Sequence, residues 1–168
     1  DRDQEEEEDP GFDWIGAILA PVGIGIGVLA IIFAPFVIMG AVKTARRTKR
    51  RNADKPADRI SGGWDELIDR AVDLNAPVAS GATRTESAQV VAATMEQPDV
   101  TALATSADAR VFGPGEPTAE DVDAFWREVD AIVVGMSGRV SVWRRLRARL
   151  SLRSLLRGRA RRARGGNA

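Results

Sequence analysis

The chain has 168 residues, in which 24 Lys and Arg residues balance 24 Asp and Glu residues, and it contains no Cys, His or Tyr. Disulfide bonds, thiol nucleophiles and Ser/His triads are therefore excluded, and the usual zinc and haem ligand sets are missing. We expect this chain to be no enzyme and to hold no cofactor or metal. Its length leaves room for one small domain beside a membrane helix.

The zero net charge conceals blocks of one sign. Residues 1–13 carry eight acids and one Arg, and residues 43–59 carry eight bases and two acids. Residues 60–138 hold fourteen acids against four bases, whereas residues 139–168 hold eleven Arg and no acid. Such blocks face solvent or a surface of opposite charge. Because the chain begins at Asp1 rather than Met, we expect it to be a piece of a longer protein or a processed product.

An uncharged run over residues 14–42 predicts a transmembrane helix. Its 29 residues give about 43 Å of helix, which exceeds a hydrocarbon core of about 30 Å and allows a kink at Pro21 or Pro35. A signal peptide is the alternative, but it has a basic front and an apolar core of about 7–15 residues. Residues 1–13 are then an acidic extracellular segment.

Basic residues follow the apolar run at once and predict its direction. The positive-inside rule keeps this side of the chain in the cytoplasm, with the N-terminus outside the plasma membrane. We predict a basic juxtamembrane linker over residues 43–60 whose side chains face anionic lipid headgroups, namely Lys43, Arg46, Arg47, Lys49, Arg50 and Arg51.

A stripe of small residues recurs along the apolar run at steps of four and three. Its members are Gly16, Ala20, Gly23, Gly27, Ala30 and Ala34. Such a stripe lets another helix approach closely, which predicts packing against other transmembrane helices of the parent protein or of a complex. The alternative is chance, since Gly and Ala are common in membrane helices.

Residues 61–138 have the pattern of an acidic helical cytoplasmic domain. The first predicted helix has apolar residues at helical spacing, namely Trp64, Leu67, Ile68, Ala71, Val72 and Leu74. The opposite face carries Asp65, Glu66, Asp69, Arg70 and Asp73. Carboxylate pairs for acid–base chemistry are one interpretation of Asp65, Glu66 and Asp69, and further along of Glu120, Asp121 and Asp123, but solvated helix faces explain both groups better. Residues 75–77, Asn-Ala-Pro, end this helix.

Two shorter helices are predicted to follow, the second and third of this domain. Thr83 and Glu86 match a capping box that opens a helix over residues 84–95. A third short helix begins at Pro98 and Asp99 and carries Val100, Leu103, Ala104 and Ala107 on one side.

The segment 113–117, Gly-Pro-Gly-Glu-Pro, is predicted to be a loop. A phosphate-binding loop is disfavoured there because no Lys-Ser or Lys-Thr follows and no strand precedes it. Thr118 with Asp121 then caps a longer helix, whose apolar residues are Val122, Phe125, Trp126, Val129, Ile132, Val133 and Met136. The predicted fold class is all-α, with one transmembrane helix, about four cytoplasmic helices and a basic tail.

The tail, residues 139–168, is Arg-rich and amphipathic. Apolar residues recur in it at approximately helical steps, and the bases include Arg144, Arg145, Arg147 and Arg149. Anionic lipid headgroups are the favoured partner. Nucleic acid is disfavoured because the segment lacks a stacking platform, while a solvated tail or one paired with the preceding acids stays open.

Five segments in residues 60–157 carry a resemblance to a known family. They are WDELIDRAVDL at 64–74, GATRTESA at 81–88, ADARVFGPGEPT at 107–118, VDAFW at 122–126 and RLRARLSLRSL at 145–155. The region resembles the C-terminal cytoplasmic part of actinobacterial membrane-bound transglutaminase-like proteins. Asn75 stands where that family has Gly, a mild departure because Asn tolerates the left-handed conformation of helix ends.

The resemblance implies a longer parent with several membrane helices and an extracellular papain-like transglutaminase domain, whose Cys, His and Asp lie upstream of this chain. We therefore expect the chain to be a non-catalytic anchor that carries a helical module to the inner leaflet or to a cytoplasmic protein. The alternative is an adaptor or signalling module that recruits a soluble protein through its acidic surface.

Overall fold

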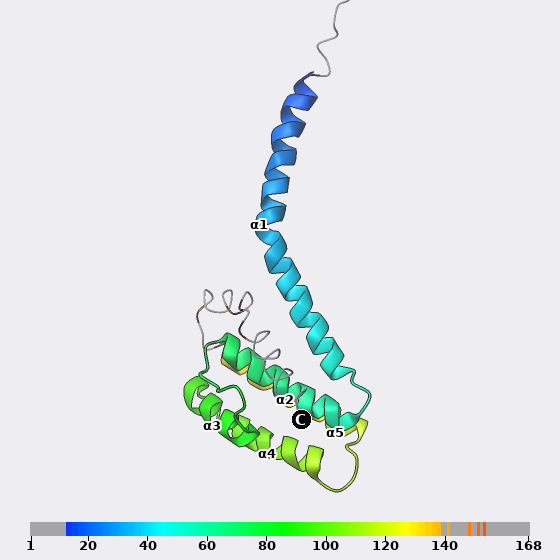
Figure 1. The fold of residues 1–168 in the computed structure, drawn as a ribbon, viewed down its shortest axis with the longest axis vertical. Coiled ribbons are helices and arrows are strands. Elements are labelled where there is room, and N and C mark those ends of the chain that lie inside the picture. The colour runs from blue at the N-terminus through cyan, green and yellow to red at the C-terminus, as the bar shows by residue number, and fades with distance from the viewer. Residues whose placement is uncertain (1–12, 139–140, 142–147, 149–150, 152, 154–168) are drawn as a thin grey trace, which may run out of the picture. The chain divides into compact units, whose positions relative to one another are not determined.

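The computed structural model describes residues 13–138 and residues 141, 148, 151 and 153, and for residues 13–18 and 20 it describes the backbone alone. The described part is all-helical, as predicted, and contains no strand. Its helices are α1 (Asp13–Arg51), α2 (Pro56–Asp73), α3 (Arg84–Met95), α4 (Asp99–Phe112) and α5 (Ala119–Gly138) (Figure 1). The chain divides into two compact units, residues 1–38 and residues 39–168.

The first unit is the apolar part of α1. This helix is long and apolar enough, between Pro21 and Arg51, to cross a membrane. Its prolines at positions 21 and 35 lie inside the helix. The large hydrophobic side chains that α1 exposes are Leu19, Val22, Ile24, Ile26, Val28, Leu29, Ile31, Ile32, Phe33, Phe36, Val37, Ile38 and Val42. A continuous apolar surface of this kind is typical of a membrane or protein interface.

The predicted linker over residues 43–60 is instead helical along most of its length. Helix α1 continues to Arg51, and α2 already begins at Pro56. The stretch after the apolar run is composed of Ala, Lys, Arg and Thr without a helix breaker, which explains the continuation. Pro56 occupies the first turn of α2, where proline costs no hydrogen bond, so the only turn between the two helices covers residues 52–55.

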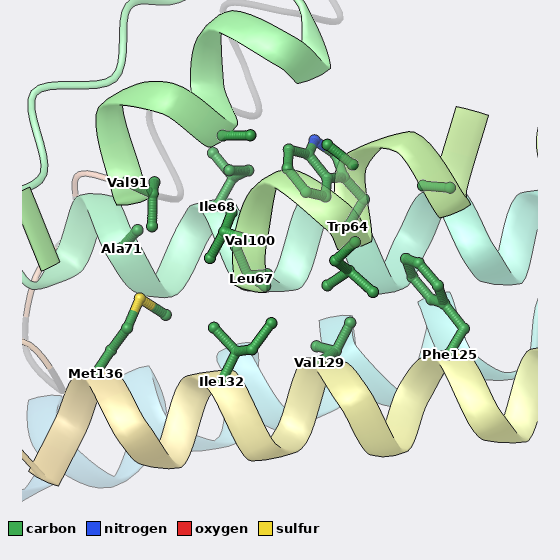
Figure 2. Packing of buried hydrophobic residues seen from close by; sticks show 14 of the residues in the cluster. Trp64, Leu67, Ile68, Ala71, Val91, Val100, Phe125, Val129, Ile132 and Met136 are labelled. Atoms are coloured by element: carbon green, nitrogen blue, oxygen red, sulfur yellow. The ribbon is translucent and has the colours of Figure 1, made fainter. Parts of the chain in front are cut away.

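Helices α2 to α5 enclose one hydrophobic core. Helix α2 lies along α5, and Val129, Ile132 and Met136 of α5 point toward α2 (Figure 2). Helices α3 and α4 pack together and contact α2. The largest fully buried side chains are Trp126, Phe125, Ile60, Leu67, Leu103, Met136, Val91, Val100 and Val129. The apolar faces predicted for α2, α4 and α5 are thereby confirmed.

The end of α2 is a left-handed turn at Asn75, whose φ is 77°. The Ala76 N–H donates to the Ala71 carbonyl at 2.8 Å, which satisfies an otherwise free carbonyl in the last turn. A positive φ strains most side chains, but Asn adopts it several times more often than other non-glycine residues. The structure therefore gives Asn75 the left-handed conformation of a helix end.

Two reciprocal caps fix the starts of α3 and α5. The Thr83 hydroxyl accepts from the Glu86 N–H at 3.2 Å, and the Glu86 carboxylate accepts from the Thr83 N–H at 2.8 Å. In the same way the Thr118 hydroxyl accepts from the Asp121 N–H at 3.1 Å, and Asp121 accepts from the Thr118 N–H at 3.0 Å. Both predicted caps are confirmed.

These caps predict a pH dependence of stability. Hydrogen bonds from the Thr83 backbone and hydroxyl lower the pKa of Glu86, and those from the Thr118 hydroxyl and backbone lower the pKa of Asp121. Their stabilisation is complete above the ordinary carboxyl pKa and is lost as the pH falls through the lowered folded value. Thermal unfolding of Glu86→Gln and Asp121→Asn should differ from wild type at neutral pH and converge with it in acid. A constant difference across this range would contradict the assignment.

Candidate functional site

The last three turns of α1 present a row of bases, which we call the basic face. It consists of Lys43, Arg46, Arg47, Arg50 and Arg51, spaced at i, i+3, i+4, i+7 and i+8. Residues at this spacing share one side of an α-helix. Opposite them lies the acidic face, which consists of Glu66, Asp69 and Asp73 of α2 and Asp130 of α5.

Ion pairs join the basic face to α2. The Lys43 Nζ lies 2.6 Å from an Asp73 oxygen, and Arg46 lies 3.4 Å from Asp69. Arg50 contacts Asp69 at 2.8 Å and also pairs with Glu66 at 3.1 Å. As residue numbers rise along α1 they fall along α2, so the two helices run antiparallel here.

Gly62 and Gly63 allow close packing on two sides of α2. A Cβ added at Gly62 would lie 2.8 Å from the Arg50 Cβ and 3.1 Å from the Arg50 carbonyl oxygen. A Cβ added at Gly63 would lie 3.0 Å from the ring of Phe125 and 3.3 Å from that of Trp126. Gly62 thus faces α1, and Gly63 faces the core helix α5.

Two bases also reach α5. Arg47 pairs with Asp130, and Arg51 lies 3.9 Å from the same carboxylate. The guanidinium groups of Arg47 and Arg51 lie 5.6 and 5.3 Å from the centre of the Trp126 ring, within cation–π range. The buried Trp126 Nε1 has no hydrogen-bond partner among the described residues. Trp126 therefore connects the core to the basic face through its ring.

The contacts of the basic face are electrostatic rather than apolar. Among the described residues, neither the hydrophobic core cluster nor the hydrophobic residues packed against it include any side chain of α1. Half-exposed pairs such as Arg51 with Asp130 contribute about 0.2–1 kcal/mol each. For Asp73, whose side chain is only 2% exposed, desolvation offsets much of the attraction to Lys43. The interface between the basic face and the acidic face is thus held by several weak ion pairs that salt screens.

Asp69 is a carboxylate that two bases of α1 share, Arg46 and Arg50. Burial raises the pKa of Asp69, although the charges of Arg50 and Arg46 act in the opposite direction. Because the folded state holds this proton more tightly, the stability that Asp69 contributes is present below its ordinary pKa and is lost as the pH rises through the raised value. The burial of Asp69 therefore offsets part of the gain from its pairing with Arg50 and Arg46.

The structure corrects the prediction that Glu66 and Asp73 belong to a solvated face. They are buried, with 7% and 5% of their surface exposed, and they contact α1. Five of the six juxtamembrane bases predicted to face lipid are paired with carboxylates, and the sixth, Lys49, is exposed. Their binding to lipid stays a prediction.

The tail bases Arg144, Arg145, Arg147 and Arg149 lie outside the described residues. Of the described tail residues, Ala148 is buried in the core cluster, and its carbonyl accepts from the Lys43 Nζ at 2.9 Å. Arg153 donates to the Asn75 side chain. These two contacts favour an intramolecularly paired tail over a fully solvated one.

The predicted helix-packing residues whose surroundings the structure describes are exposed. Gly23, Gly27, Ala30 and Ala34 are exposed, and no described atom outside α1 lies within 4 Å of a Cβ built on either glycine. The side chain of Ala20 and the surroundings of Gly16 lie outside the described part. Packing of the stripe against another helix stays a prediction.

One cavity of about 220 Å³ lies between α2, α3 and α4, away from the basic face. Its lining includes Trp64, Ile68, Arg84 and Phe112, and Arg84 lies 5.5 Å from the centre of the exposed Phe112 ring. Within the described part of the chain, no group of acidic side chains is arranged to hold a metal ion. The paired basic and acidic faces are therefore the strongest candidate site.

Known proteins do not identify this arrangement. Comparisons with protein families, curated proteins and solved structures found no match. The candidate site therefore depends on its own contacts. A signal for it is present in the sequence, because bases at 43, 46, 47 and 50 and acids at 66, 69 and 73 share complementary helical spacings.

Proposed function

We propose that the chain is a non-catalytic membrane anchor that carries a helical module, α2 to α5, on the cytoplasmic side of the plasma membrane. The observation that carries the proposal is the exposed apolar surface of α1, which runs directly into the basic face that holds the module. A surface of that extent is stable in lipid and promotes aggregation in water.

The charges on both sides of the apolar run support this orientation. Eight acids precede it and the bases of residues 43–51 follow it, a distribution that under the positive-inside rule supports a cytoplasmic position for α2 to α5. Each base close to an anionic leaflet contributes about 1 kcal/mol of attraction. The basic face thus has two sources of negative charge, the acidic face and the lipid.

The anchored protein is proposed to be a transglutaminase-like enzyme upstream in the same polypeptide, on the strength of the sequence resemblance alone. The small-residue stripe of α1 would then pack against the membrane helices of that parent. An adaptor role is the second candidate, and it is supported by carboxylates of α5 that are exposed and outside the acidic face, Glu120, Asp123 and Glu128.

Membrane insertion and direction predict a protease pattern in intact cells. With tags at both ends, the full chain should resist carbonate extraction, and an external protease should remove the N-terminal tag while the C-terminal tag survives until the cells are permeabilised. Release by carbonate would overturn the anchor. Loss of the C-terminal tag in intact cells would reverse the direction and leave the anchor standing.

A further inference from the structure

We propose that anionic phospholipid headgroups compete with the acidic face for the basic face of α1, so that a negatively charged membrane releases the helical module from the end of its membrane helix. The inference rests on the proposed function, because it requires α1 to be inserted in lipid. It adds a regulated interaction surface to what would otherwise be a passive anchor.

The first argument is that release leaves the core intact. The described core cluster is built from residues of α2 to α5, the residues that follow α2, and Ala148, and α1 contributes none of them. Separating α1 from α2 and α5 therefore removes ion pairs, the Lys43–Ala148 hydrogen bond and cation–π contacts, and of the core side chains it uncovers the face of the Trp126 ring over which Arg47 and Arg51 lie. A segment held in this way can leave its partner while the partner stays folded.

The second argument is position along the chain. Lys43 follows the last uncharged residue, Val42, directly, and residues 43–51 cover about 13 Å of helix. The Debye length at physiological salt is about 8 Å, so the first turns of this segment lie within range of a charged leaflet. Lys49 is exposed and adds a base that the acidic face does not engage among the described residues.

The third argument is that the two attractions are of similar strength. Asp130 and Arg51 keep 40% and 44% of their side-chain surface exposed, which leaves this pair open to screening. The buried carboxylates Glu66 and Asp73 recover their hydration when α1 leaves, which favours release. Lipid phosphates offer the same bases a comparable attraction.

Repulsion between the acidic face and the anionic membrane favours release further. Once the basic face binds lipid, the carboxylates of the acidic face lose their cationic partners on α1 next to an anionic surface, while Glu66 keeps its ion pair with Arg70 at 3.4 Å. The membrane repels them, as like charges within a Debye length do. Lipid binding and separation of the module therefore favour each other.

The test measures the distance between α1 and the module in the full chain. Because the chain has no Cys, spin labels at Thr48→Cys on α1 and Gln89→Cys on α3 are unique, and both positions are exposed. In phosphatidylcholine vesicles at low salt we expect one short distance. With about 30% phosphatidylglycerol, the share of longer distances should rise at least about threefold.

A pair of variants separates the acidic face from general charge. The triple change Glu66→Gln, Asp69→Asn and Asp130→Asn should give long distances even in phosphatidylcholine. The matched triple Glu120→Gln, Asp123→Asn and Glu128→Gln removes equally many exposed charges of α5 and should behave as wild type. If the first triple variant loses its helical circular dichroism, the wild-type chain in high salt takes its place in the test. Salt screens the ion pairs between the two faces, so it should lengthen the wild-type distance in phosphatidylcholine vesicles.

The outcomes distinguish the proposed lipid competition from the proposed anchor function. A distance that stays short in phosphatidylglycerol vesicles and in salt, with the protein still co-floating with the vesicles, would overturn the competition and leave the anchor in place. A chain that fails to co-float would overturn both. A lengthening of equal size in both triples would assign the effect to total charge and overturn the role of the acidic face.

Discussion

Replacing Trp126 with Ala is expected to lower the free energy of unfolding of the helical module by about 3–5 kcal/mol. The Trp126 side chain is fully buried beside Phe125, and Gly63 of α2 is adjacent to both rings. Truncation removes a large apolar surface and leaves a cavity. A domain of this size has a total stability on the order of 5–15 kcal/mol, so the change removes a large part of it. Urea unfolding in detergent micelles, followed by far-UV circular dichroism, measures the loss.

Two comparisons isolate the cause. Phe112→Ala removes another aromatic ring, but this ring is 78% exposed and the change should cost less than about 1 kcal/mol. Trp126→Phe keeps most of the buried apolar surface and removes the buried indole N–H, so it should cost less than Trp126→Ala. Equal losses for Trp126→Ala and Phe112→Ala would contradict the placement of Trp126 in the core.

The variants Gly62→Ala and Gly63→Ala should have different effects although their positions are adjacent. In an open helix this change is stabilising by about 1 kcal/mol. At Gly63 the new methyl meets the Phe125 ring, and we expect a loss of about 1–3 kcal/mol from the core. At Gly62 it meets the Arg50 backbone, so α1 is displaced while α2 to α5 remain folded.

The α1–α3 label distance and urea unfolding separate these two results. Gly62→Ala should lengthen the distance and leave the unfolding midpoint near that of wild type, whereas Gly63→Ala should lower the midpoint. Gly40→Ala is the control, because no described atom outside α1 lies within 4 Å of its added Cβ. A fall in the midpoint for Gly62→Ala as large as that for Gly63→Ala would show that α1 belongs to the core after all.

Local rules of the sequence predicted most of the helical module. The reciprocal Thr–Glu and Thr–Asp caps, the left-handed Asn75 and the apolar periodicity of α5 each depend on residues within one or two turns. Such signals require no knowledge of the neighbouring helices. For the same reason the helix-free segment 113–117 was predicted correctly from its Gly and Pro content.

The acidic face could not be predicted in this way. Amphipathic analysis identifies the apolar side of α2 and assigns the polar side to water, because solvated acids are the common case. Glu66 and Asp73 depart from it only because another helix supplies Lys43 and Arg50. The bases of residues 43–51 are as frequent in a juxtamembrane linker that faces lipid as in a paired helix, so their composition alone does not indicate a protein partner.

The short turn over residues 52–55 restricts how the length of this chain can change. Helices α1 and α2 form an antiparallel hairpin whose charges match turn by turn. One residue inserted between Lys43 and Arg51 rotates the remaining bases by about 100° and breaks their register with the acids. The same insertion in the turn leaves both helices unchanged. We therefore expect insertions and engineered tags to be tolerated in the turn and not in the helix beside it.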